Sequence, residues 1–447
     1  MVNYEDKELD ILRNAVDLAE KRVGKKTVNA PQVQEIISIV EDFLRTKKLI
    51  CYGGTAINNI LPTQDQFYDK SIEIPDYDFF SSNALSDAKE LANIYHKKGF
   101  ESIEAKAGVH FGTYKVFVNY IPVADITFLE TKLFKNIMKD SILVAGIYYC
   151  APNYLRMSMF LELSRPMGDV SRWEKVLKRL MLLNKHYPLK SKYCSNLTIQ
   201  RSSGDAAIEH EELIYNTIKK GFIDQGLVFF GSFANSLYTQ YMPSKLRKKL
   251  HKVPDFDVLS EEPYKSAVMI KERLGYENIK NVKIVKQPGL GEVIAPHYEI
   301  RVGDDTLAFI YQPLACHSYN IITIDKMKIK IATIDTMLSF YLAFLYSGRD
   351  YYDTERILCM SEFLFDVQQK NRLEQKGLLR RFSINCYGHQ ETLDVMRQEK
   401  SKKHEELKNK KNSEEYQQWF LSYKPGANKE EKEEKQKSNK KTRKNRK

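Results

Sequence analysis

Residues 74–80 have the sequence IPDYDFF, a short apolar stretch that carries two acids. On a strand, residues i and i+2 share a face, so Asp76 and Asp78 project together while Tyr77 and Phe79 project to the opposite side. Neighbouring carboxylates repel each other, and a hard cation such as Mg²⁺ or Mn²⁺ would neutralise them. The stretch therefore predicts either a metal-binding strand or a solvated acid pair on an edge strand.

A glycine pair stands upstream of this strand. Residues 52–55, YGGT, follow a short apolar run and precede a helical pattern. Gly53 and Gly54 let the backbone approach a ligand closely, the helix N-terminus offers N–H groups, and Thr55 adds a hydroxyl donor. This arrangement suits a triphosphate, although a Gly-Gly before a helix is more often only a tight turn.

A third acid stands downstream, in residues 121–128, IPVADITF. The pattern predicts an apolar strand with Asp125 in its middle. A lone carboxylate on such a strand is more often paired structurally than catalytic, but as a third ligand beside Asp76 and Asp78 it completes a two-metal site. The three motifs together are far more specific than any one of them.

The three motifs resemble those of the DNA polymerase β-like nucleotidyltransferase superfamily. With residues 171–176, SRWEKV, they look more particularly like the poly(A) polymerase catalytic subunits of large cytoplasmic DNA viruses, the mimivirus-like group above all. The resemblance covers roughly residues 1–400. It implies a mixed sheet bearing three carboxylates, ATP as the substrate and the single-stranded 3′ end of an RNA as the acceptor. The implied activity is template-independent addition of AMP to RNA, as in mRNA polyadenylation.

The resemblance also implies a role for each site residue. Asp76 and Asp78 would bind both of two Mg²⁺ or Mn²⁺ ions, and Asp125 would bind the ion that activates the attacking 3′-hydroxyl. The two glycines and Thr55 would hold the β and γ phosphates of ATP. Members of the family commonly have serine at the position of Thr55, which supplies the same hydroxyl with an extra methyl.

A basic helix face is a further candidate. Arg172, Lys175 and Arg179 fall on one side of a predicted helix, and apolar residues form the other side. A solvated basic face is one interpretation. The other is phosphate contact, in which Arg172 and Lys175 bind the nucleotide or the RNA.

The order of the motifs recurs along the chain. The matched landmarks are residues 54–58 with 231–235, residues 75–78 with 254–257, and His110 with His297. This recurrence predicts an α+β protein of two tandem duplicated nucleotidyltransferase-like units, each a mixed sheet with flanking helices. We place the catalytic unit, with its N-terminal helices, at residues 1–190 and the second unit at residues 191–400.

The second unit departs from the first at the third acid. Ser232, Asp255 and Asp257 preserve the first two motifs. With His110 and His297 taken as equivalent, we place Phe309, in the acid-free strand within residues 306–311, opposite Asp125. Without an acid there the two-metal site is incomplete, so the second unit is interpreted as a degenerate copy. The second unit is expected to form one wall of the active-site cleft, to bind RNA or to mediate self-association into a homo-oligomer.

Charge is concentrated at the end of the chain. The net charge of the 447 residues is +12, but 17 Lys and Arg against 8 Glu from Lys400 onward supply +9 of it. The pI is therefore a poor argument for nucleic-acid binding by the folded part. Residues 401–447 are rich in Lys, Glu, Asn and Gln, and we expect a flexible, disordered basic tail. Its one apolar island, residues 419–421, could dock back on the folded part.

Cysteines and hydropathy bear on the compartment. The 6 cysteines form no CxxC and no cluster at zinc spacing, so we expect neither a disulfide framework nor a zinc site. The N-terminus lacks the pattern of a signal peptide, and no long apolar window occurs, so we expect a soluble intracellular protein without a membrane partner. The resemblance adds the host cytoplasm, in a viral factory or virion.

Two alternative functions stay open. A metal motif does not reveal base choice, so a CCA-adding, uridylyl-transferring or oligoadenylate synthase-like enzyme is the nearest alternative to a poly(A) polymerase. A non-catalytic RNA-binding scaffold that kept the fold is the alternative of another class.

Overall fold

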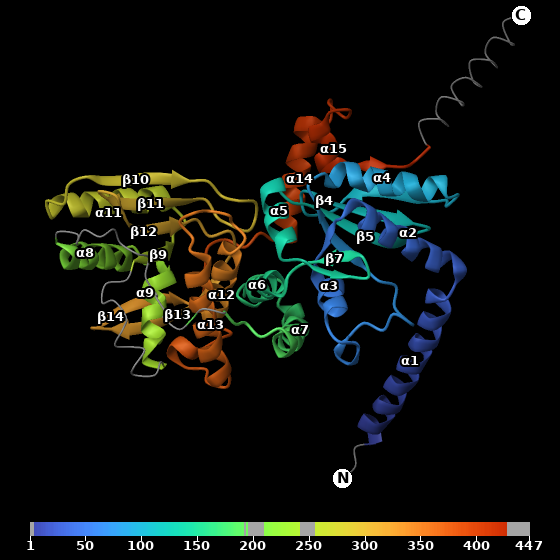
Figure 1. The fold of residues 1–447 in the computed structure, drawn as a ribbon, viewed down its shortest axis with the longest axis horizontal. Coiled ribbons are helices and arrows are strands. Elements are labelled where there is room, and N and C mark those ends of the chain that lie inside the picture. The colour runs from blue at the N-terminus through green and yellow to red at the C-terminus, as the bar shows by residue number, and fades with distance from the viewer. Residues whose placement is uncertain (1–3, 192–193, 195–209, 242–254, 427–447) are drawn as a thin grey trace, which may run out of the picture. The chain divides into compact units, whose positions relative to one another are not determined.

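The computed structural model describes residues 4–191, 194, 210–241 and 255–426 of the chain. The chain separates into two compact units, one made of residues 1–150 and 393–447 and the other of residues 151–392. We call these unit 1 and unit 2, and Figure 1 follows both along the chain. The divisions differ from the boundaries expected at residues 190 and 400.

Unit 1 is built on a mixed sheet of 8 strands in the order β16-β3-β4-β5-β2-β1-β7-β6. The pairs β5–β2 and β1–β7 are parallel, and the other neighbours are antiparallel. The strands are β1 (Ile50–Cys51), β2 (Tyr77–Ser81), β3 (Ile103–Ala107), β4 (Thr113–Val118), β5 (Ile121–Phe128), β6 (Ile142–Val144), β7 (Ile147–Tyr149) and β16 (Ser422–Tyr423).

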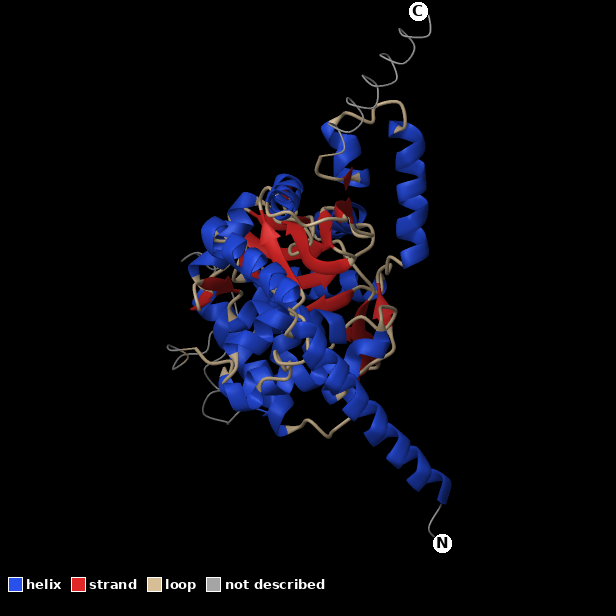
Figure 2. Cartoon of the chain, turned by 90° about the vertical axis from the view of Figure 1, so that its right-hand side faces the viewer, coloured by secondary structure: helices blue, strands red, loops and turns tan. Residues whose placement is uncertain are grey.

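Helices of unit 1 bury apolar faces against this sheet and each other. Pro31 stands at the first position of α2, where its missing N–H costs nothing, and α2 buries Ile36, Val40 and Leu44. The Tyr95 hydroxyl of α4 donates to the Ile36 carbonyl at 2.8 Å, which ties α4 to α2. The helices are α1 (Tyr4–Val28), α2 (Pro31–Lys47), α3 (Gly53–Ile60), the 3₁₀ turn η1 (Thr63–Asp65), α4 (Ala84–Lys97), α5 (Thr131–Lys139), α14 (Leu393–Leu407) and α15 (Glu414–Phe420). Helix α1 runs out to the N-terminus (Figure 2).

The C-terminal part of unit 1 corrects the expectation of a tail from residue 401. Leu407 and Leu421 are buried, and β16 pairs with β3. The Trp419 ring lies 4.4 Å from the Phe111 ring, between centroids. The expectation is wrong for residues 401–426 because these few apolar side chains and one strand pair dock the segment on the sheet. The remainder, residues 427–447, lies outside the described residues.

Unit 2 is built on a second mixed sheet of 8 strands in the order β10-β11-β12-β9-β8-β14-β13-β15. The pairs β12–β9 and β8–β14 are parallel, and the other neighbours are antiparallel. The strands are β8 (Val228–Phe230), β9 (Phe256–Leu259), β10 (Val282–Gln287), β11 (His297–Val302), β12 (Asp305–Tyr311), β13 (His317–Ile324), β14 (Met327–Ala332) and β15 (Cys386–Tyr387).

The two sheets have the same design. Without β16 and β15, which extend opposite edges, strand order and pairing direction agree position by position. The predicted α+β fold of two tandem duplicated units is confirmed.

Helices α6 and α7 belong to unit 2, which explains the division at residue 150. Tyr154 of α6 meets Tyr346 edge to face at 5.3 Å, and Ser318 N–H donates to the Ser164 carbonyl at 2.8 Å. Arg156 is fully buried and donates to Asn184 of α7. The helices are α6 (Pro152–Leu163), η2 (Val170–Arg172), α7 (Trp173–His186), α8 (Glu211–Asp224), α9 (Gly231–Leu237), η3 (Tyr238–Tyr241), α11 (Pro263–Tyr276), α12 (Ile334–Phe344), α13 (Thr354–Lys370) and η4 (Gly377–Leu379).

Two disulfides in unit 2 contradict the expectation that none form. They join Cys194 to Cys359 and Cys316 to Cys386 across 165 and 70 residues of sequence. Spacing along the chain could not reveal partners so far apart. Cys51 and Cys150 are free and buried.

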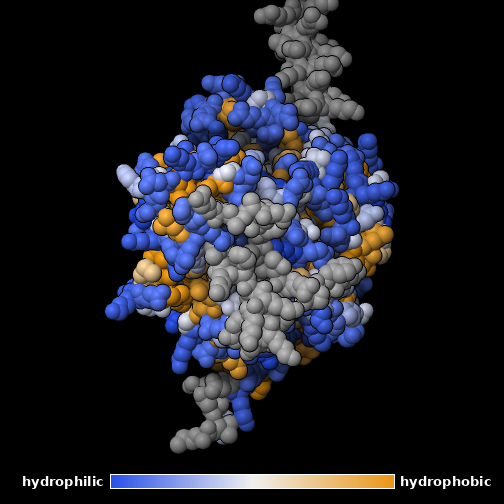
Figure 3. Space-filling model, turned by 60° about the vertical axis from the view of Figure 1, so that its left-hand side comes forward, coloured by the Kyte–Doolittle hydropathy of each residue, from blue (hydrophilic) through white to orange (hydrophobic). Residues whose placement is uncertain are grey.

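One face of the surface can be described by its polarity. The face drawn in Figure 3 is largely hydrophilic, with hydrophobic residues in separate patches. Among the residues that the structure describes, no helix is both long and apolar enough to cross a membrane.

Candidate active site

Parallel pairing of β2 with β5 brings two of the predicted acids together. Asp78 and Asp125 stand directly opposite each other in the register of the two strands. Tyr77 and Phe79 are buried on the other face, and Asp78 is half-buried, as the alternation predicted. Asp76 precedes the first residue of β2 and is exposed.

The Asp76 carboxyl lies within electrostatic reach of Asp125. Desolvation by the surrounding protein is the larger cause that raises the pKa of Asp76, and the negative charge of Asp125 raises it further. Lys115 opposes both effects. The three acids predicted from sequence therefore form one cluster on unit 1.

Lys115 is a member of this cluster that sequence analysis missed. It stands opposite Asp125 in the antiparallel pair β4–β5, and its ammonium donates to Asp125 Oδ2. The side chains of Lys115 and Asp125 are 40% and 17% exposed. An ion pair of such exposure contributes about 0–1 kcal/mol to stability. The alternation of residues 113–118, with half-buried and buried side chains in turn, was the available signal, but register was needed to pair Lys115 with Asp125.

The glycine turn that follows β1 lies against Asp78. Gly53 has a φ of 71°, and a Cβ at this position would lie 2.8 Å from Asp78 Oδ2. Only glycine fits both constraints without strain. The N–H of Tyr52 donates to the Asp78 carbonyl at 2.9 Å, which fixes the turn against β2.

The predicted phosphate-binding residues begin helix α3. Gly53 and Gly54 are its first two residues, and Thr55 is the third. Thr55 is buried, and its hydroxyl donates to the Asp76 carbonyl at 2.5 Å. In this structure the hydroxyl fixes the loop that carries Asp76.

A chain of hydroxyls lies beside the acids and was not predicted. The Tyr52 hydroxyl is 2.8 Å from Thr127 Oγ1, which is 3.0 Å from Thr113 Oγ1. Burial is the main cause that raises the pKa of Tyr52, and the charges of Asp78 and Asp125 raise it further, so the phenol stays neutral. The signal was again strand alternation, since Thr127 is two residues beyond Asp125.

Arg172 and Lys175 belong to unit 2, whereas the acid cluster belongs to unit 1. Arg172 ends η2, and its Nε lies 3.2 Å from Glu162 Oε1. Lys175 is on α7, whose Val176 and Leu180 are buried as expected for its apolar side. Nucleotide contact by Arg172 and Lys175 stays a prediction.

Unit 2 repeats the glycine turn and keeps Asp255 and Asp257, but it lacks the third acid. Gly231 has a φ of 74°, and a Cβ there would lie 2.6 Å from the Cβ of Asp257. Asp257 stands opposite Phe309 in the pair β9–β12, as Asp78 stands opposite Asp125. Phe309 is fully buried, and its ring lies 5.4 Å from His297 and 5.3 Å from Tyr351, between centroids. The placement of Phe309 opposite Asp125 agrees with the register.

The glycine landmark of the repeat is corrected by one residue. Both Gly53 and Gly231 begin a helix with positive φ, so Gly231 corresponds to Gly53 and not to Gly54. Phe233, not Ser232, then takes the place of Thr55. Its ring packs on Phe229 and Phe256 where Thr55 offers a hydroxyl.

The histidine landmark is also wrong. His297 begins β11 opposite Tyr311, two residues beyond Phe309. The residue so placed in unit 1 is Thr113, opposite Thr127. His110 is instead an exposed residue of the bend before β4.

The donor set suits a hard divalent ion. Carboxylate oxygens are the ligands that Mg²⁺ and Mn²⁺ prefer, and the glycine turn leaves room beside Asp78 that a side chain would fill. In the described residues, no three His, Cys, Asp or Glu side chains already converge in a ligating arrangement. Asp125 accepts from Lys115 instead.

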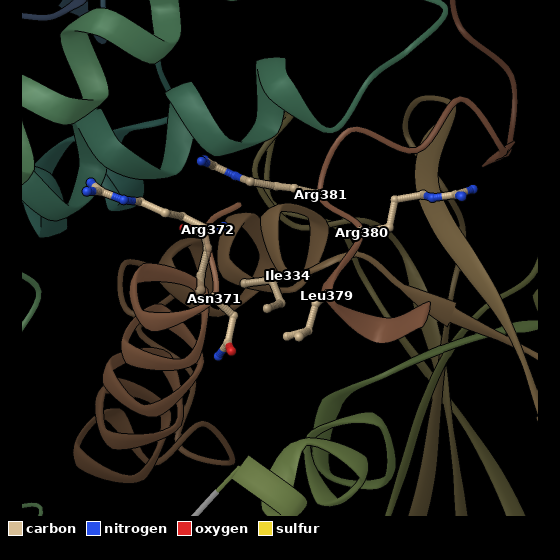
Figure 4. Close-up of a pocket in the computed structure, with 7 residues that line it drawn as sticks. Ile334, Asn371, Arg372, Leu379, Arg380 and Arg381 are labelled. Carbon is tan, nitrogen blue, oxygen red and sulfur yellow. The ribbon is translucent and has the colours of Figure 1, made fainter. Parts of the chain in front are cut away.

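A basic recess lies elsewhere, in unit 2. Its lining residues are Ile334, Gln368, Asn371, Arg372, Leu379, Arg380 and Arg381. Figure 4 shows Arg372 and Arg381 extending toward the same side. Arg381 is paired with the buried Asp335 at 2.8 Å, whereas Arg372 and Arg380 are exposed. The recess offers cations rather than metal ligands.

A glycine turn before a helix thus faces acids on adjacent parallel strands of a mixed sheet, the arrangement that the sequence resemblance led us to expect. Comparison with known proteins bears on the class of protein. Residues 38–169 match the family model of the poly(A) polymerase catalytic subunit. The polyadenylate synthase of Megavirus has a similar structure, with a TM-score of 0.78 at 19% identity over 95% of this chain and 86% of that one.

Two curated viral proteins, each provisionally named a poly(A) polymerase catalytic subunit, are similar in sequence. One, from Acanthamoeba polyphaga mimivirus, is 26% identical over 61% of this chain and 47% of its own length. The other, from African swine fever virus (isolate Pig/Kenya/KEN-50/1950), is 32% identical over 37% of this chain and 36% of its own. The matches thus span at most about half of these relatives. They confirm the resemblance to catalytic subunits of large cytoplasmic DNA viruses.

Proposed function

We propose that the protein is a template-independent poly(A) polymerase that adds AMP from ATP to RNA 3′ ends. The observation that carries the proposal is that Asp78 and Asp125 stand directly opposite each other on adjacent strands, beside the Gly53 turn. Only unit 1 has two acids opposite each other in this way, because in unit 2 Phe309 stands opposite Asp257. The names of the similar viral proteins favour adenylate over other nucleotides.

Asp76, Asp78 and Asp125 would hold the Mg²⁺ or Mn²⁺ ions. When bound, these ions lower the pKa of the attacking 3′-hydroxyl and stabilise charge on the pyrophosphate leaving group. Helix α3 begins at Gly53, so its first N–H groups would receive the ATP phosphates. Thr55 holds the Asp76 loop through the Asp76 carbonyl, so its part is to position an acid as well as to offer a hydroxyl.

Unit 2 would bind the RNA acceptor. Arg172 and Lys175 are candidates for phosphate contact, and so is the recess in Figure 4, where Arg372 and Arg380 are exposed. Arginine is suited to phosphate oxygens because its planar guanidinium donates in pairs. Replacing Arg372 and Arg380 by Glu should weaken RNA binding without changing metal binding by unit 1. We leave self-association out of this proposal, since no comparison supports it.

The sources of the relatives suggest where the protein works. They come from mimivirus and African swine fever virus, which are large cytoplasmic DNA viruses. We therefore place the protein in the host cytoplasm, in a viral factory or virion.

One assay tests the activity. The purified full chain is incubated with an RNA primer, Mg²⁺ or Mn²⁺, and each labelled nucleoside triphosphate alone, with Asp78→Asn as the inactive control. Extension by ATP in preference to the others supports the proposal. Preference for CTP or UTP indicates a CCA-adding or uridylyl-transferring enzyme, and primer-independent products indicate an oligoadenylate synthase-like enzyme. No incorporation with any primer favours an RNA-binding scaffold.

A further inference from the structure

A row of charged residues crosses the sheet of unit 1. Lys106, Lys115, Asp125 and Asp78 stand opposite one another on β3, β4, β5 and β2. Lys106 is engaged elsewhere, with its Nζ 4.3 Å from the Phe117 ring centroid. Lys115 is the cation of the row whose ammonium contacts the acid cluster, at Asp125 Oδ2.

This contact competes with metal binding. An ammonium at hydrogen-bond distance from a carboxylate oxygen repels a divalent ion that approaches the same oxygen. Asp125 can serve fully as a ligand only when Lys115 has moved away.

We propose that Lys115 is the internal counter-ion of the carboxylate cluster and that a divalent ion binds unit 1 by displacing its ammonium from Asp125. The inference rests on the proposed function in that Asp76, Asp78 and Asp125 are taken as the metal ligands. Lys115 acts on the metal through Asp125, so it is a positioning residue. It neutralises the acids before the ion arrives and sets how tightly the ion binds.

Unit 2 provides an internal comparison. The residue opposite Phe309 on β11 is Glu299, which therefore takes the place of Lys115. Glu299 is buried and accepts from Arg301 at 2.7 and 2.9 Å and from Gln287 at 3.1 Å. Where the third acid is replaced by phenylalanine, the facing lysine is replaced as well. The lysine thus occurs together with the acid that it neutralises.

The Lys115 contact is also open enough to break. Lys115 is 40% exposed, so its ammonium can turn into solvent. The Arg381–Asp335 pair of unit 2 differs, because it is 11% and 0% exposed and Arg381 donates through both Nε and Nη2. That pair is fixed in the core, whereas the Lys115 pair can exchange its cation.

The test measures Mn²⁺ binding by the full-length protein without ATP or RNA, by electron paramagnetic resonance of free Mn²⁺ or by calorimetry. We expect Lys115→Met to bind Mn²⁺ about fivefold more tightly than wild type, because the competing cation is gone. The metal-free melting temperature of this variant should fall, and saturating Mn²⁺ should raise it by more than in wild type. Lys115→Arg keeps a cation and should stay near wild type.

Lys47→Met is the matched control. Lys47 is 32% exposed and pairs with Asp87 and Glu90 of α4, so its removal should leave Mn²⁺ affinity unchanged. Lys115→Met with unchanged or weaker Mn²⁺ binding, while Asp76→Asn abolishes it, would overturn the counter-ion role alone. Equal Mn²⁺ binding by wild type and Asp76→Asn would instead overturn the metal site and with it the proposed function.

Discussion

The two units place different side chains on one scaffold. Gly53 and Gly231 have nearly the same positive φ, and each lies against the aspartate of the adjacent strand. Opposite that aspartate, unit 1 has the half-buried Asp125 and unit 2 has the fully buried Phe309. The glycine turn is thus a requirement of the fold, which persists in the unit that lacks the third acid. The residue opposite the aspartate distinguishes a candidate catalytic unit from its structural copy.

The largest effect should come from removing acids of unit 1. Asp78→Asn and Asp125→Asn should each lower turnover about 10³-fold, because metal stabilisation of the transition state is worth several kcal/mol. Asp257→Asn, the matching change in unit 2, should alter turnover less than about threefold. Labelled AMP incorporation measures the effect, with circular dichroism to confirm folding. If Asp257→Asn and Asp78→Asn lowered turnover by comparable factors, the proposed functional difference between the two units would be wrong.

Exchanging the distinguishing residues should change stability next. Phe309→Asp places a carboxylate in a fully buried aromatic cluster and should destabilise the protein by about 3–5 kcal/mol. Asp125→Phe changes a partly exposed position and should destabilise much less. Urea denaturation midpoints compare the two variants. A Phe309→Asp protein as stable as wild type would show that unit 2 retains room for a third acid.

The glycine turns should differ in how well they tolerate a side chain. Gly231→Ala would place a Cβ 2.6 Å from the stiff Cβ of Asp257, and positive φ adds strain, so we expect a loss of about 1–3 kcal/mol. Gly53→Ala meets only the end of the Asp78 side chain, which can turn away. Its stability should fall less and its activity more. Thermal melting and AMP incorporation are measured on both variants. A larger loss of stability in Gly53→Ala, or a larger loss of activity in Gly231→Ala, would contradict this expectation.

Unit 2 should also respond to acid through His317. Neither ring nitrogen of His317 has a hydrogen-bond partner among the described residues, and burial, with a smaller effect of Arg165, lowers its pKa to about 3. The unfolded histidine titrates near pH 6.5, so the folded state is fully favoured above that pH and loses stability as pH falls toward 3. At pH 5 the loss should be about 2 kcal/mol.

The variant His317→Phe checks this assignment. Its melting temperature should change less than that of wild type between pH 7.5 and pH 5, because the titrating group is gone. An identical pH dependence in the two proteins would place the acid sensitivity elsewhere.

The smallest effect should come from the end of the chain. Truncation after Gly426 removes 10 Lys and Arg and 4 Glu, so RNA binding should show a shallower salt dependence, by about 0.7 per lost phosphate contact. The melting temperature should not change. Truncation after Lys400 also removes Leu421 and β16 and should lower it. If RNA binding by the full-length and the Gly426-truncated proteins had equal salt dependence, residues 427–447 would have no role in RNA binding.

The parts of the fold that depend on local pattern could be predicted from sequence. The local pattern predicted a strand with Asp76 and Asp78 on one face and an apolar strand with Asp125 in its middle. The recurrence of the glycine turn and of the Pro-Asp-x-Asp stretch predicted two units. These predictions succeed because side-chain alternation is a local property of a strand. The absence of an acid from the strand within residues 306–311 was visible in the sequence itself.

Predictions that needed register or distant contacts failed. Two adjacent glycines left the match to Gly231 ambiguous, and only the positive φ of Gly53 resolves it. Lys115 could not be paired with Asp125 without the antiparallel register of β4 and β5. Composition alone predicted disorder after residue 400, yet burial of Leu407 and Leu421 and a two-residue strand hold residues up to 426 on the sheet.

The discontinuity of unit 1 gives its synthesis an order. Ribosomes deliver β3 early and β16 last, with the whole of unit 2 made in between. Until Ser422 and Tyr423 arrive, β3 is an open sheet edge of the kind that pairs with other chains. A prematurely terminated chain can therefore contain every acid of the cluster and still leave its sheet unfinished. The sheet of the proposed catalytic unit is thus completed only after unit 2 has been synthesised.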